Sequence, residues 1–238
     1  MRQSLGLPPD RGGTSRRALH AGVLVPWANS VVEAELPRWA GNSVVWHYAR
    51  LVPSSRVTVL DEEFLAGLLA AAPAALGELA ALPISRVYLA CTSAAFVLPG
   101  QAAAALAGAQ VPVITAFDSI TAVLRQRGVD RIALLTPYPP RICQAEAEIF
   151  HTCGITVTAR ASLDLRDGYA AIDAGQVQAL ARQVSTGAME EAQAIILSCT
   201  GWPTFGLVAG LRRQFGKDVI SSNLAIVAHA LQPGNEEG

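Results

Sequence analysis

Two short runs of this chain share one order of residue types and place a cysteine at the same point. Residues 87–93 read Val-Tyr-Leu-Ala-Cys-Thr-Ser, and residues 194–201 read Ala-Ile-Ile-Leu-Ser-Cys-Thr-Gly. Each is an apolar, strand-like run followed by a small residue, a cysteine and a threonine. A cysteine at the carboxyl end of a parallel strand points into the crevice where open α/β sheets bind ligands. Two facing crevices would bring Cys91 and Cys199 to one substrate, which predicts proton transfer at carbon without a cofactor.

A catalytic thiol needs surroundings that stabilise its thiolate form. A thiol is a nucleophile or base only as the thiolate, so we expect each cysteine pKa to lie below the free value of about 8.5. A helix that starts after each strand would lower it, because the unpaired N–H groups at a helix start favour anions. We expect Cys91 to act as nucleophile or first base, and Cys199 as acid or second base. The alternative is that both are small buried side chains of the core.

The elements that must position these thiols alternate along the chain. Strands are expected over 21–25, 43–51, 86–90 and 111–114, and again over 131–135, 155–158, 194–197 and 219–221. Helices are expected over 31–39, 61–82, 100–108, 119–127, 141–153, 176–189, 207–215 and 224–231, and the long 61–82 region is expected to be interrupted or to restart near Pro73. Such alternation predicts parallel sheets joined by right-handed crossovers. The fold class is therefore predicted as α/β, with two pseudo-symmetric, doubly wound lobes, each with a mainly parallel four-stranded sheet, and a cleft between them. One larger sheet is the alternative.

The repeat also predicts the domain boundaries. Residues 1–17 are rich in Gly, Pro, Ser and Arg without periodicity, which is typical of a flexible tail. The first lobe is expected over 18–118 and the second over 119–220. The C-terminal segment 221–238 is expected to pack back on the first lobe.

Composition excludes several classes of partner. The chain has 238 residues, 51% of them hydrophobic and 16% charged, which indicates a compact globular protein. A net charge of −1 gives no reason to expect nucleic acid or a membrane surface as partner. Four cysteines are too few for a disulfide framework in a chain of this length, so we expect free thiols and a cytoplasmic location. No Cys/His cluster has metal-ligand spacing, and a homo-oligomer is compatible with the sequence.

Four motifs, in order, resemble those of a known family. Val25-Pro26-Trp27-Ala28-Asn29-Ser30, followed by Glu33 and Glu35-Leu36-Pro37, is similar to the opening motif of the maleate isomerase and arylmalonate decarboxylase branch of the aspartate/glutamate racemase superfamily. The other three motifs are Ala90-Cys91-Thr92-Ser93, Thr136-Pro137-Tyr138 and Ser198-Cys199-Thr200-Gly201. The resemblance covers nearly the whole chain after the tail. It implies a pair of α/β lobes with the site between them and no metal or organic cofactor.

The motifs also suggest which residues bind substrate. Asn29 follows the first strand, where its amide could hold a substrate carboxylate, although Asn is also a common helix N-cap. Tyr138 follows the matching strand of the second lobe and could donate to the same carboxylate, or simply pack in the core. Amides and hydroxyls after the two cysteines would form an oxyanion site; these residues are Thr92, Ser93, Thr200 and Gly201.

The branches of the resemblance differ in what they imply for the reaction. Arylmalonate decarboxylases have glycine in place of the first cysteine, whereas this chain has Cys91, as the isomerases and racemases do. Thr92 and Ser93, however, are similar to the decarboxylase oxyanion loop. Gly168 is the nearest match to an asparagine that maleate isomerases carry in the second lobe.

We therefore predict a cofactor-independent isomerase or racemase that acts on a small carboxylic or dicarboxylic acid, most similar to maleate cis-trans isomerase. The alternative is an arylmalonate-type decarboxylase. A third hypothesis is a two-lobed binding protein for a small acid without turnover, which would need no paired thiols.

Overall fold

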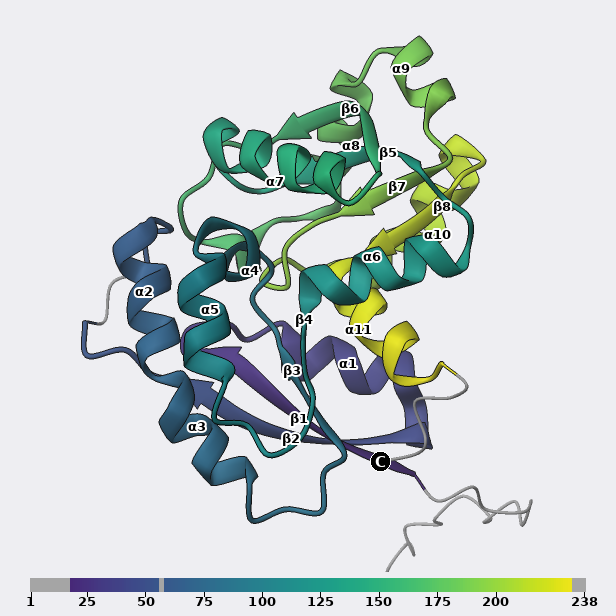
Figure 1. The fold of residues 1–238 in the computed structure, drawn as a ribbon. Helices are drawn as coiled ribbons and strands as arrows, with labels where there is room; N and C mark the ends of the chain where they lie inside the picture. The colour runs from purple at the N-terminus through teal and green to yellow at the C-terminus, as the bar shows by residue number, and fades with distance from the viewer. Residues whose placement is uncertain (1–17, 56–57, 233–238) are drawn as a thin grey trace, which may run out of the picture.

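Two separate sheets, each of four strands, organise residues 18–55 and 58–232, which are the residues that the computed structural model describes. The strand order is β2-β1-β3-β4 in the first sheet and β6-β5-β7-β8 in the second, so the two halves share one topology. Every pair of neighbouring strands is parallel. The prediction of two four-stranded parallel sheets is confirmed (Figure 1). The strands are β1 (Leu19–Pro26), β2 (Val44–Leu51), β3 (Arg86–Leu89), β4 (Val113–Thr115), β5 (Arg131–Thr136), β6 (Thr156–Ser162), β7 (Ala194–Leu197) and β8 (Asp218–Ser221).

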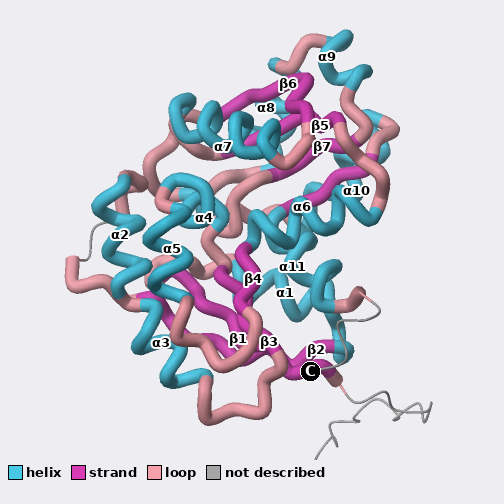
Figure 2. The backbone as a smooth tube through the Cα atoms, viewed as in Figure 1, coloured by secondary structure: helices cyan, strands magenta, loops and turns pink. Residues whose placement is uncertain are grey.

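Helices connect the strands and cover both faces of each sheet (Figure 2). In the first half they are α1 (Val32–Ala40), α2 (Glu62–Ala70), α3 (Ala72–Leu79), α4 (Thr92–Val97), α5 (Pro99–Leu106) and α6 (Ala116–Gln126). In the second half they are α7 (Pro140–Thr152), α8 (Ala174–Gln183), α9 (Thr186–Glu191), α10 (Phe205–Phe215) and α11 (Ser222–Ala230). Two short 3-10 helices are η1 (Gly41–Ser43) and η2 (Tyr169–Ala171).

Two predicted helices are each divided, and local residue types explain the breaks. The predicted helix 61–82 is α2 followed by α3, and Pro73 stands in the first turn of α3, where proline is tolerated because that turn needs no N–H donor. The predicted helix 176–189 is α8 followed by α9, which Ser185 caps through a hydrogen bond from Ala188 N. Helix α4 was not predicted, and the remaining elements lie within a few residues of their expected positions, except that β6 is longer.

The two faces of β1 show how the first sheet is packed. Successive residues of a strand point to opposite faces. Val23 packs in a cluster with Ile226 of α11, whereas Leu24 belongs to the cluster that includes the leucines of α2 and α3. Gly22 lies on the second of these faces, and a Cβ there would come within 2.9 Å of Leu79 Cδ1. Glycine therefore permits the close approach of α3 to the sheet.

The last helix, α11, lies on the first half although it follows the last strand of the second half. It contacts α1 and α6, and Ile226 and Val227 are buried in the same cluster as Val23 (Figure 1). The two halves are therefore held together by the C-terminal part of the chain. The predicted tail 1–17 lies outside the described residues. No described helix combines the length and apolar character needed to cross a bilayer.

Candidate functional site

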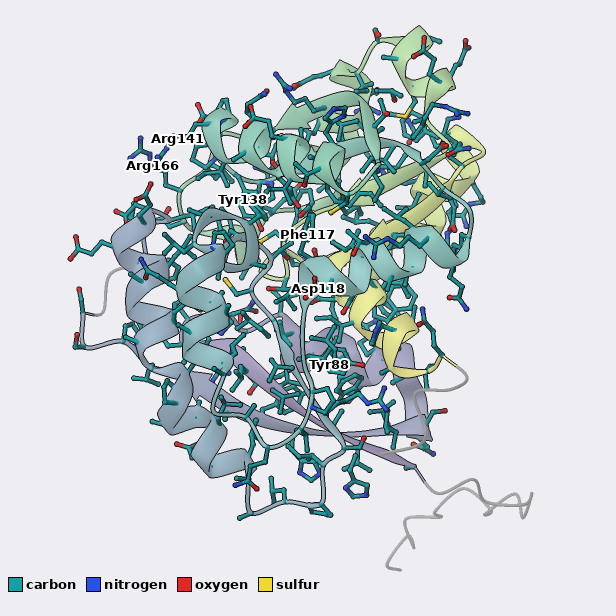
Figure 3. All side chains as sticks on the ribbon, viewed as in Figure 1. Tyr88, Phe117, Asp118, Tyr138, Arg141 and Arg166 are labelled. Atoms are coloured by element: carbon teal, nitrogen blue, oxygen red, sulfur yellow. The ribbon has the colours of Figure 1, made fainter. Side chains whose placement is uncertain are left out.

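A cavity of about 340 Å³ lies where the carboxyl ends of β1, β3, β5 and β7 meet. This is where open α/β sheets bind ligands. Figure 3 shows Tyr138 at the level where the two halves meet, with Arg141 and Arg166 toward the outer side. All the residues that the sequence predicted for the site line this one cavity: Asn29, Cys91, Thr92, Ser93, Tyr138, Cys199, Thr200 and Gly201.

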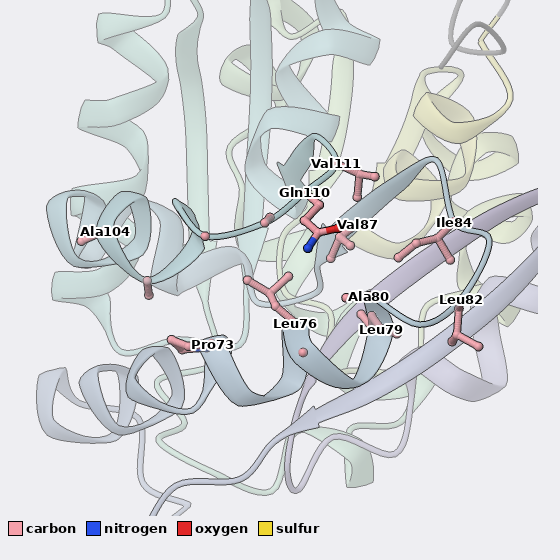
Figure 4. A pocket seen from close by; sticks show the side chains of 14 residues that line it. Pro73, Leu76, Leu79, Ala80, Leu82, Ile84, Val87, Ala104, Gln110 and Val111 are labelled. Carbon is pink, nitrogen blue, oxygen red and sulfur yellow. The ribbon is translucent and has the colours of Figure 1, made fainter.

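A larger hollow of about 470 Å³ lies between α3 and α5 (Figure 4). Its described lining is apolar side chains, glycines and Gln110, and it includes no titratable group. It therefore offers no acid, base or nucleophile. The cavity with the two cysteines is the candidate active site on chemical grounds.

Cys91 follows β3 and Ala90 and is the N-cap of α4, so the unpaired N–H groups at the start of that helix lie next to its sulfur. The Cys91 Sγ lies 3.8 Å from Ser93 Oγ, and the backbone N–H of Ala94 is hydrogen-bonded to the sulfur. These contacts favour the thiolate, but burial outweighs them. Burial raises the pKa of Cys91 above its ordinary value.

Cys199 lies at the equivalent position after β7 but in a different local structure. Its φ is 144°, which L-residues rarely adopt. No helix follows directly: the chain turns through Gly201 and Pro203 before α10 begins, because the residue before a proline is disfavoured in helical conformation. Gly201 N donates to Cys199 Sγ at 3.2 Å, and the Tyr138 hydroxyl also bonds the sulfur.

The expectation that both thiol pKa values are lowered is wrong. Burial raises the pKa of Cys199 to about 12, despite the lowering effect of Gly201 N–H and the Tyr138 hydroxyl. Desolvation penalises the thiolate more than these neutral donors stabilise it. A helix start follows only Cys91, not both cysteines. The raised pKa of each cysteine favours the protonated thiol, a form that suits an acid better than a nucleophile.

Asn29 contacts both the start of α1 and the other half of the protein. Its side-chain Oδ1 accepts hydrogen bonds from Val31 N at 2.9 Å and Val32 N at 3.2 Å, at the start of α1. Its Nδ2 points to the other half and donates to Thr200 Oγ1 at 3.2 Å. Val31 is the N-cap of α1, so Asn29 precedes the cap position, but its amide binds the backbone at the start of the helix and also lines the cavity.

A buried serine joins the two cysteine turns and was missed in the sequence. Ser222 Oγ accepts a hydrogen bond from Thr92 Oγ1 at 3.0 Å and another from Cys199 N at 3.0 Å. Thr200 Oγ1 also donates to Ala90 O at 2.7 Å. The backbone on both sides of the cavity is therefore fixed by contacts between the halves. A polar pair after the last strand, Ser222 and Asn223, was the signal that could have revealed it.

One wall of the cavity is apolar and comes from segments that the sequence analysis did not assign to the site. Leu60 and Phe64 line it from the first half, and Tyr169 from η2 of the second. Leu60 N donates to Arg166 O at 2.7 Å, which ties the two segments together. Among the described lining residues, Asp167 alone carries a charge. Neutral donors must therefore hold any carboxylate bound there.

Of the other residues noticed in the sequence, two cysteines lie outside the site and Gly168 lies in it. Cys143 and Cys153 are not in the cavity lining. Gly168 does line the cavity, and with φ of 69° it presents backbone where maleate isomerases are expected to carry asparagine. In the part of the chain that the structure describes, no group of His, Cys, Asp and Glu could hold a metal ion.

This fold and cavity define an α/β enzyme built from two like halves. The chain belongs to the arylmalonate decarboxylase family, whose model matches residues 75–234. It is 28% identical over 221 residues to a maleate isomerase of Nocardia farcinica (strain IFM 10152), covering 86% of this chain and 85% of that protein.

Solved structures of two such enzymes share the fold of this chain. The fold matches a cysteine-to-serine mutant of Nocardia farcinica maleate cis-trans isomerase that holds a covalently bound succinylcysteine intermediate, with a TM-score of 0.80 and 25% identity over 90% of this chain and 92% of that one. A liganded double mutant of arylmalonate decarboxylase has a TM-score of 0.73 at 19% identity, over 93% and 94% of the two chains, which shows a shared fold.

Proposed function

We propose that this protein is a cofactor-independent isomerase or racemase that uses Cys91 and Cys199 on a small carboxylic acid. The observation that carries the proposal is that thiols from equivalent strand ends of the two halves line one cavity. The N–H groups and hydroxyls beside them are neutral donors suited to an enediolate, the charge-bearing intermediate of proton transfer next to a carboxylate.

Maleate is the first substrate to test, because both a sequence relative and a solved relative are maleate isomerases. In this reaction Cys91 first gives its thiol proton to solvent, and the thiolate adds through Sγ to one alkene carbon; the proton returns from solvent after the C–S bond has broken. The alkene electron pair takes the Cys199 proton at the other carbon. Rotation about the new single bond, return of that proton to Cys199 and cleavage of the C–S bond then give fumarate. The protonated state of Cys199 matches its part as proton donor.

In the racemase version the same two thiols act on a saturated acid. One thiolate removes the α-proton, and the other cysteine delivers a proton to the opposite face of the carbanion. This version needs no alkene in the substrate, and it uses the same donors to hold the enediolate.

Decarboxylation of an arylmalonate is the second candidate. It is favoured by the Thr92 and Ser93 hydroxyl residues in the lining and by the apolar wall of Leu60 and Phe64, which would accommodate an aryl group. In that reaction the C–CO₂ bond breaks, CO₂ leaves, and Cys199 donates the proton to the enediolate. Against this candidate, the Cys91 side chain lines the same cavity and takes up space that an aryl group or the leaving carboxylate would need.

One assay panel separates these reactions. The protein is incubated in D₂O with maleate, with phenylmalonate and with α-substituted carboxylic acids, and the products are followed by NMR. We expect fumarate from maleate, or deuterium at the α-carbon of a saturated acid. Carbon dioxide release from phenylmalonate alone would favour the decarboxylase. Binding without turnover or exchange of any of these acids would favour the non-catalytic hypothesis and contradict the proposal.

A further inference from the structure

Glu35 is a buried carboxylate of α1 that lies outside the cavity lining and contacts the other half of the protein. Only 3% of its surface is exposed. It accepts hydrogen bonds from Thr204 N and from the Thr204 hydroxyl, the latter at 2.8 Å. It also accepts from Phe205 N at 2.6 Å and from Asn223 Nδ2 at 2.9 Å. These donors are all neutral and all belong to the second half.

Two of these contacts hold the start of α10. Thr204 is the N-cap of that helix and Phe205 is its first residue, so their N–H groups have no partner within the helix. A carboxylate at this position satisfies them and interacts favourably with the helix dipole. The segment that runs from Cys199 to α10 is therefore fixed at its far end by a residue of the first half.

The Asn223 contact reaches the candidate site more directly. The same Asn223 Nδ2 donates to Glu35 Oε2 and to Thr200 O at 3.2 Å. Thr200 follows Cys199, and Gly201 N bonds the Cys199 sulfur. A chain of hydrogen bonds thus leads from Glu35 through Asn223 to the backbone that presents both the thiol and its N–H donor.

Burying a carboxylate is unfavourable unless hydrogen bonds compensate for the lost solvent. Here the compensating donors are those that shape the turn after Cys199, so the carboxylate and the turn depend on each other. We propose that Glu35 is a positioning residue that sets the Cys199–Gly201 turn from the opposite half of the protein. The proposal rests on the proposed function in one respect, that this turn binds the developing enediolate.

The first test replaces Glu35 by glutamine. The amide keeps one acceptor but places an NH₂ group among N–H donors, so the turn loses part of its support. We expect kcat to fall by about tenfold or more, as for loss of an oxyanion donor, with KM changed much less. Glu78→Gln, an equivalent charge change on the exposed face of α3, is the control and should leave both constants unchanged.

A second variant distinguishes positioning from general stability. Asn223→Ala breaks the link to Thr200 O but leaves Glu35 on the start of α10. We expect it to lower kcat as well, and we expect the double variant Glu35→Gln/Asn223→Ala to be less impaired than the product of the two single effects. Folding is monitored by urea unfolding. A folded Glu35→Gln enzyme with kcat within twofold of wild type would overturn the proposal, as would fully independent effects of the two replacements.

A substrate-free measurement keeps this test separate from the proposed function. The rate at which iodoacetamide alkylates Cys199 is measured at about pH 8, with the modified cysteine located by peptide mass spectrometry. If Glu35 positions the turn, Glu35→Gln displaces Gly201 N–H from the sulfur, which disfavours the thiolate, and the alkylation rate falls by at least about threefold. An unchanged rate contradicts the positioning role, even if none of the tested acids is turned over. A reduced rate without turnover of those acids contradicts only the proposed function.

Discussion

The side chain of Asn29 donates a hydrogen bond to the hydroxyl of Thr200 across 171 residues of sequence, at 3.2 Å from Nδ2 to Oγ1. Its Oδ1 simultaneously accepts from Val31 N and Val32 N at the start of α1. One amide therefore joins the first half's opening helix to the turn after the second cysteine.

These two contacts of Asn29 can be separated by substitution. Asn29→Ser keeps an oxygen that can cap α1 but removes the amide donor, so we expect stability within about 0.5 kcal/mol of wild type. Asn29→Ala removes both and is expected to cost about 1 kcal/mol in the free energy of unfolding. Both variants should raise KM for the acid substrate. The checks are urea unfolding and steady-state kinetics, and equal stability of the two variants would show that the Oδ1 contacts with the start of α1 do not stabilise the fold.

The backbone of Cys199 gives a prediction about strain. Its φ of 144° is costly for a residue with a Cβ and is accessible to glycine. We expect Cys199→Gly to be about 1 kcal/mol more stable than Cys199→Ala, although both lack the thiol and should be inactive. Urea unfolding of the two variants measures the difference. An alanine variant as stable as the glycine variant would show that the turn relaxes without strain.

Glu146 of α7 predicts a pH dependence of stability. The side chain is fully buried, and its Oε1 accepts a hydrogen bond from Ser198, the residue before Cys199. Its Oε2 has no hydrogen-bond partner among the described residues. Burial raises the pKa of Glu146 from 4.5 to about 8, with a smaller lowering by the Ser198 hydrogen bond. The folded protein therefore binds this proton more tightly than the unfolded chain does.

The sign follows from proton linkage. Between pH 4.5 and about 8 the folded state holds a proton that the unfolded state has lost, so stability falls as the pH rises through this interval. The limiting slope for one proton is about 1.4 kcal/mol per pH unit. In Glu146→Gln this fall of stability with rising pH should be absent. The exposed control Glu148→Gln on the same helix should show it as wild type does. Parallel stability curves for wild type and Glu146→Gln between pH 5 and 8 would contradict the assignment.

The sequence predicted the sheets and the cysteine turns because both depend on local pattern. The run from Ala194 to Leu197 is wholly apolar, as a strand buried on both faces must be, and Cys199 follows it at a strand end. The matching order of motifs around Cys91 then predicted the repeat. Each of these signals lies within a few consecutive residues.

The remaining parts of the site depend on contacts between segments distant in sequence. Tyr169 lies in η2, a 3-10 helix of three residues that is too short to show periodicity, so nothing local indicated that it lines the cavity. Ser222 and Glu35 each bind a partner in the other half, Thr92 and Phe205 respectively, which only the packing of α11 and α1 reveals. The thiol pKa values were mispredicted for the same reason, because burial of Cys199 results from the whole fold and not from the helix starts considered in the sequence.

The most direct test of the central claim compares the cysteines on whichever acid the wild type turns over. Turnover is measured by NMR for Cys91→Ala, Cys199→Ala and the control Cys153→Ala, whose cysteine does not line the cavity. We predict at least about a thousandfold loss of activity in each of the first two and wild-type activity in the third. Activity within tenfold of wild type in either Cys91→Ala or Cys199→Ala would contradict an enzyme that uses one thiol from each half.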